Sequence, residues 1–69
     1  MKYDIITALV KDCHAKIAMA KMNVHILLNN PVGVGDHPDI TRTIQGELDI
    51  IAQNKGRLSV LQEEFNGED

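Results

Sequence analysis

The sequence predicts an all-α fold, an antiparallel two-helix hairpin that dimerises into a four-helix bundle. Three observations lead to this prediction. Residues 3–28 contain neither glycine nor proline, their apolar residues recur with helical spacing, and a stretch with proline and glycine at 31–35 separates them from a second periodic stretch. A chain of 69 residues has room for one small domain, so residues 1–69 are expected to form a single helical hairpin.

The first helix is expected over residues 3–29. Its apolar residues follow one another in alternating steps of four and three, which is the heptad pattern of packed helices. A second apolar row lies beside the first, so the apolar face is wider than contact with one partner helix requires. The first row is Ile6, Val10, Cys13, Ile17, Ala20, Val24 and Leu27, and the second is Ala15, Met19, Met22 and Ile26.

A loop is expected over residues 30–36. Pro31 pushes the preceding residue out of the helical conformation, and asparagine is well tolerated at the carboxyl end of a helix. Val32 and Val34 are apolar in a segment that could have been polar. Either they close the end of the bundle, or they are an exposed contact for a partner.

The second helix is expected over residues 37–65, with Asp36 or His37 as its amino-terminal cap. Pro38 fits the first turn, where its missing N–H costs nothing, and Asp39 there faces the positive end of the helix dipole. The alternative is a metal site, because Asp36, His37 and Asp39 carry oxygen and nitrogen ligands. Three candidate ligands in four residues rarely converge on one ion, so capping is the favoured interpretation and no metal or cofactor is expected.

The apolar row of the second helix is less regular than that of the first. Asn54 and Lys55 interrupt it, and Gly46 and Gly56 each cost the helix about 1 kcal/mol relative to alanine. Residues 66–69 are expected to form a frayed tail. The row is Ile40, Ile44, Leu48, Ile51, Leu58, Leu61 and Phe65.

The register of the hairpin follows from a turn centred on Val34. Residues whose numbers sum to about 68 should face each other, and Asn54 should then lie near His14 as a buried polar pair that fixes the register. The two aromatic residues would meet at the open end. The expected pairs are Val24 with Ile44, Ala20 with Leu48, Ile17 with Ile51, Val10 with Leu58, and Tyr3 with Phe65.

A hairpin of two helices cannot enclose a hydrophobic core, because each helix leaves one side of its apolar face in water. Two hairpins related by twofold symmetry can bury these sides in a four-helix bundle. The second apolar row of the first helix is the expected dimer face, and a homodimer is the expected state.

Composition restricts the compartment and the chemistry. Cys13 is the single cysteine, which excludes an intrachain disulfide and a cysteine zinc cluster and suits the reducing cytoplasm. Charged residues interrupt the apolar amino-terminal run, so neither a signal peptide nor a membrane span is expected. A net charge of −3 and an isoelectric point near 5.4 argue against a general nucleic-acid-binding protein. No Ser–His–Asp arrangement and no Glu-x-x-His motif is apparent, so an enzyme is not expected.

The runs KMNVHILLNNPVGVGDHPDI (21–40) and IQGELDIIAQNKGRLSVLQ (44–62) carry a resemblance. They resemble short uncharacterised proteins of large tailed phages of marine cyanobacteria, in which an Asn-Pro-Val-Gly-x-Gly-x-His-Pro-Asp segment joins two amphipathic helices. The resemblance covers residues about 16 to 65. It implies no established activity, and it makes a phage accessory or regulatory role the expectation.

The leading functional hypothesis is a non-enzymatic helical-hairpin homodimer that binds another, unknown protein. Its expected contact residues are Val32, Val34, Met19, Met22 and Ile26. The alternative is an RNA-binding hairpin dimer, an architecture shared with the plasmid Rop protein. Its expected RNA contacts are Lys11, Lys16 and Lys21. The net negative charge of the chain argues against this RNA-binding alternative.

Overall fold

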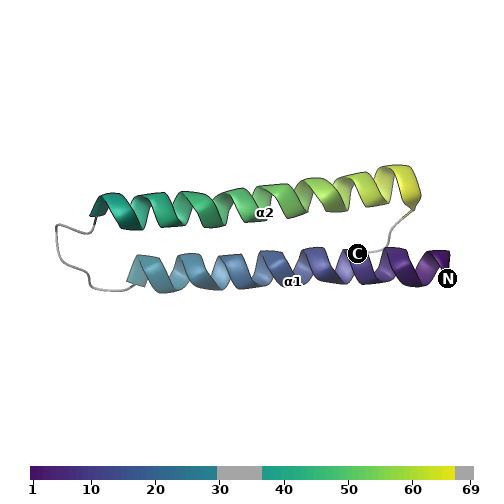
Figure 1. Cartoon of the computed structure of the whole chain (residues 1–69), viewed down its shortest axis with the longest axis horizontal. Helices are drawn as coiled ribbons and strands as arrows, with labels where there is room; N and C mark the ends of the chain where they lie inside the picture. Colours follow the sequence, from purple (N-terminus) through teal and green to yellow (C-terminus); the bar gives the residue numbers. More distant parts are fainter. Residues whose placement is uncertain (30–36, 67–69) are drawn as a thin grey trace.

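In the computed structural model, two long helices lie side by side and run antiparallel as an elongated rod (Figure 1). Helix α1 spans Lys2–Asn29 and helix α2 spans His37–Phe65, against the expected ranges 3–29 and 37–65. The structure describes residues 1–29 and 37–66, and these contain no strand. The predicted all-α hairpin is therefore confirmed.

Local polar contacts mark the ends of both helices. The side-chain amide of Asn29 donates to the carbonyl of His25, one turn earlier in α1, at 2.7 Å. The Thr43 hydroxyl donates to the carbonyl of Asp39 in the first turn of α2 at 2.8 Å. After Phe65, Asn66 has a φ of 57°, the left-handed conformation that commonly ends helices and that asparagine tolerates.

The first apolar row predicted for α1 packs against α2. Each of its seven residues is buried or half-buried. Cys13 is among the most buried of them and packs as a small apolar side chain, as expected. The heptad pattern of α1 therefore predicted the inward face of this helix correctly.

The inward face of α2 differs from the predicted row, because two predicted residues are exposed and two polar residues outside the row face inward. Leu48 is 50% exposed and Phe65 is 51% exposed, whereas Glu47 is half-buried and Asn54 is buried. Regular steps of four and three lead from Ile44 to residue 47, so Leu48 lies about 100° away from the contact. The inward column is Ile40, Ile44, Glu47, Ile51, Asn54, Leu58 and Leu61.

The register lies within about two residues of the expected one. The side-chain amide of Asn23 in α1 donates to the Glu47 carboxylate in α2 at 2.6 Å, and these residue numbers sum to 70 rather than 68. The expected pairing of Ala20 with Leu48 is wrong, because Leu48 is turned outward. Tyr3 and Phe65 are both largely exposed, so the expected aromatic pair is not buried at the open end.

The hydrophobic core is small. Four buried side chains make up its cluster, and Ile17 and Leu61 pack against them from the edge. Val10 and Leu58, an expected pair, both belong to this cluster. Most other large apolar side chains of the described residues remain in contact with water. The cluster is Ile6, Val10, Cys13 and Leu58.

Candidate interaction face

Two grooves lie along the same side of the hairpin, where α1 and α2 meet. Their volumes are about 570 and 340 Å³. The surface formed by their lining residues is called the groove face below. The first groove is lined by Leu9, Asp12, Cys13, Gly56, Arg57, Val60 and Leu61, and the second by Lys16, Met19, Ala20, Asn23, Glu47, Ile50, Gln53, Asn54 and Arg57.

Apolar side chains lie in both grooves. Leu9 from α1 and Val60 from α2 line the first, and both are about half exposed. Met19 and Ile50 line the second and are 58% and 39% exposed. Each groove therefore has an exposed apolar contribution from both helices, which is the composition expected of a helix-packing surface.

The apolar column of α1 continues past the grooves at both ends. Ile5 and Ile26 lie at multiples of seven residues from Met19, so they share its column on the helix. Both are more than half exposed. Apolar side chains of this column thus lie toward both ends of α1, with Asp12 between Ile5 and Met19.

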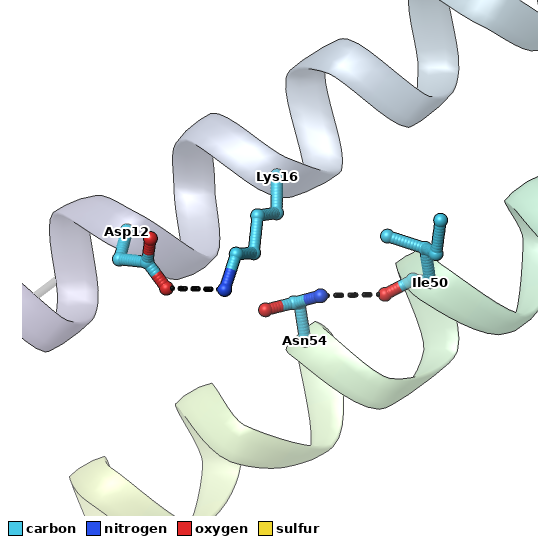
Figure 2. A network of polar contacts seen from close by, with 4 residues as sticks. All are labelled: Asp12, Lys16, Ile50 and Asn54. Atoms are coloured by element: carbon cyan, nitrogen blue, oxygen red, sulfur yellow. Dashed lines mark hydrogen bonds and ion pairs between the residues drawn. The ribbon is translucent and has the colours of Figure 1, made fainter.

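A polar layer lies where the two grooves adjoin, because Asp12 lines the first and Lys16 and Asn54 line the second. The Lys16 ammonium is 2.9 Å from the Asp12 carboxylate, an ion pair one helical turn apart on α1. Figure 2 shows this ammonium between the Asp12 carboxylate and the Asn54 side chain of α2. Asp12, Lys16 and Asn54 are called the polar layer below.

Asn54 is the most deeply buried side chain of the described residues, with 1% of its surface exposed. Its amide nitrogen donates to the Ile50 carbonyl of its own helix at 2.8 Å. Its amide oxygen has no hydrogen-bond partner. The expectation of a buried polar position at Asn54 is confirmed, but the side chain of α1 that points toward it is Lys16, while the expected neighbour His14 is exposed.

The opposite side of the hairpin has a different character. It is formed by the residues that directly follow the inward positions 13, 20, 47 and 54, and it is called the opposite face below. Because successive helical residues turn by about 100°, these residues point away from the grooves. They are His14, Lys21, Leu48 and Lys55, and Lys11 and Leu28 lie on the same side because they directly follow the inward positions 10 and 27. None of them lines either of the two grooves.

The candidate RNA contacts do not share one side of α1. Lys11, Lys16 and Lys21 are spaced five residues apart, so each is rotated by about 140° from the next. Lys16 belongs to the polar layer and is paired with Asp12, whereas Lys21 lies on the opposite face. Lys11 and Lys21 lie on the same side of the helix, about 80° apart, so the described structure separates Lys16 from the other two and the three do not form one basic strip.

Several of the other predicted contacts lie outside the described residues. Val32, Val34 and Asp36 fall in the segment 30–36, and the side chain of His37 is not described either. Asp39 is exposed and lies 4.0 Å from Arg42, a weak surface pair. Within residues 1–29 and 37–66 there is no group of three His, Cys, Asp or Glu side chains that could hold a metal ion.

The predicted contacts Met19, Met22 and Ile26 are all exposed. Met19 lines a groove, and Ile26 shares its column. Sequence reasoning missed the contributions of Leu9, Ile50 and Val60, because the rows were drawn on each helix separately. Extending the column of Met19 by sevens to Ile5 would have indicated how far this face extends.

Comparison with protein-family models, with curated protein sequences and with solved structures gives no match to this chain. Neither described helix is long and apolar enough to cross a membrane.

Proposed function

We propose that this protein is a non-enzymatic interaction module, a helical hairpin that pairs with a second copy as a four-helix bundle and, in that form, binds another protein. The observation that carries the proposal is the mismatch between its small core and its large exposed apolar surface. Contiguous exposed apolar surface commonly marks a protein interaction site.

The accessible surface gives this mismatch a size. The chain exposes 5268 Å², whereas a compact monomer of its mass, 7.7 kDa, exposes about 4,300 Å². The excess of about 1,000 Å² comes from a rod two helices thick, which has too little interior to bury its apolar residues. Association with a second hairpin is the simplest way to bury them.

Binding of a further protein uses apolar side chains outside the groove face. Met22 on α1 and Leu48 on α2 are both about half exposed and line neither groove. They stay accessible when the groove face is covered. An accessory or adaptor role, as the resemblance to cyanobacterial phage proteins implies, needs no more than such a surface on a rigid bundle.

Sedimentation equilibrium of the purified chain tests the proposal. Across a roughly hundredfold range of protein concentration, the mass should rise from that of one chain toward that of two. A mass of 7.7 kDa at every concentration would contradict it. A gel-shift series at low and moderate salt tests the RNA-binding alternative. The absence of a shift at low salt would exclude this alternative.

A further inference from the structure

We infer that the groove face is the surface on which a second copy of this chain docks, so that the polar layer becomes part of the interior of the dimer. This inference rests on the proposed function for the existence of a dimer. It specifies which of the two sides of the hairpin the second copy covers.

The charges of the groove face are self-complementary. Asp12 and Glu47 contribute two negative charges, and Lys16 and Arg57 contribute two positive ones. Twofold symmetry places the same surface on both sides of an interface, so this surface has to be complementary to a second copy of itself. A face with equal numbers of both signs meets this requirement, because opposite charges can be brought together across the axis.

The opposite face does not meet this requirement. Its charged residues, Lys11, Lys21 and Lys55, are all positive. Two copies docked through it would oppose like charges, which disfavours association. Its exposed apolar contributions are Leu28 and Leu48, whereas the groove face has Leu9, Met19, Ile50 and Val60.

The surface available matches what a stable dimer requires. A standard protein interface buries about 800 Å² on each partner. The excess exposure of the whole chain over a compact monomer, about 1,000 Å², is large enough to supply such an interface. The column from Ile5 to Ile26 also gives the face the length of a helix–helix contact rather than that of a small-molecule site.

The polar layer is compatible with being covered. The Lys16 ammonium has three N–H donors and one ion-pair partner, Asp12. The Asn54 oxygen is an acceptor without a donor, and Figure 2 shows it on the side of Lys16. When a second copy excludes water, these complementary groups can satisfy each other, so the layer can lie inside a bundle.

Two matched substitutions test which face is covered. Leu9 on the groove face is 47% exposed and Leu48 on the opposite face is 50% exposed, so a change of either to glutamate alters the same chemistry at equal exposure. Leu9→Glu should raise the dimer dissociation constant about tenfold or more, whereas Leu48→Glu should leave it within about threefold. Sedimentation equilibrium measures both, with circular dichroism to verify helicity. An equal effect of the two substitutions, or a larger one from Leu48→Glu, would overturn the inference.

A second measurement needs no substitution. In a mixture of isotopically labelled and unlabelled chains, filtered nuclear Overhauser spectra report contacts between copies. Contacts should involve the methyl groups of Leu9, Met19 and Val60 and not those of Leu48. A dimer whose contacts come from Leu48 alone would overturn the inference and leave the proposed function standing. A chain that stays monomeric at all concentrations would overturn both.

Discussion

At the level of single residues, Asn54 occupies a position that helix pairs usually give to an apolar side chain. It is almost fully buried, and its amide oxygen has no hydrogen-bond partner. Leaving a buried acceptor unpaired costs about 1–3 kcal/mol. A polar residue retained at such a cost often fixes the register and the partner of a helix, because other alignments would bury it without any neighbour of matching polarity. Lys16 and Asp12 supply that neighbourhood here.

Replacing Asn54 by leucine should therefore raise the free energy of unfolding by about 1–2 kcal/mol per chain, since an unsatisfied polar group leaves the interior. Urea denaturation followed by circular dichroism measures the change. Ser59→Leu, on the exposed outer surface of α2, is the control and should change stability by less than about 0.5 kcal/mol. If Asn54→Leu instead lowered the free energy of unfolding, the Asn54 amide would stabilise the fold by more than the cost of its unpaired oxygen.

At the level of the helices, the two elements differ in how far the sequence predicts them. In α1 every inward position is apolar, so the heptad pattern identifies the whole face. In α2 the inward column alternates apolar residues with Glu47 and Asn54, and an apolar residue, Leu48, directly follows Glu47. A pattern based on hydrophobicity therefore selects Leu48. The helical repeat that packs against α1 instead places residue 47 at the contact, and residue 47 is a glutamate. The groove face was missed for a related reason, since it is built from columns of both helices and exists only once their register is known.

The corrected inward face of α2 predicts unequal costs for two leucine truncations. Leu58 belongs to the core cluster and Leu48 is half exposed. Leu58→Ala should lower the free energy of unfolding by about 2–4 kcal/mol, because it removes buried methyl groups and leaves a cavity. Leu48→Ala should lower it by less than about 1 kcal/mol. Denaturant titration of the two variants side by side measures the difference. Equal losses of stability would contradict the outward placement of Leu48.

The two glycines inside α2 give a prediction of the opposite sign. A methyl group added at Gly46 or Gly56 would meet no atom of the chain within 4 Å. Gly46→Ala should stabilise the helix by about 0.5–1 kcal/mol, because alanine restricts the unfolded chain and favours the helical one. Gly56 lines the first groove, so Gly56→Ala should give the same gain only where the second copy leaves room for the added methyl group. Thermal denaturation at fixed concentration measures this. Destabilisation by either change would reveal close packing of a second molecule at that glycine.

At the level of the whole molecule, the hairpin is 51 Å long and 15 by 13 Å across. Such a rod has much surface for its volume, and chains of this size are marginally stable without a metal, disulfides or association. Its one cysteine is free and buried, so no disulfide within the chain supplements the small core. Stability and association are therefore expected to be coupled.

This coupling predicts that the thermal midpoint depends on protein concentration. If two chains unfold as one dimer, each tenfold increase in concentration stabilises the folded state by about 1.4 kcal/mol, and the midpoint rises by several degrees. Circular dichroism in cells of different path length covers the range with one protein stock. Leu9→Glu should lower the midpoint and weaken its concentration dependence, while Leu48→Glu should keep both close to those of the unchanged protein. A midpoint that stays constant over a hundredfold range would mean that the two helices of one chain hold each other without a partner, and the excess exposed surface would then have to serve a different protein.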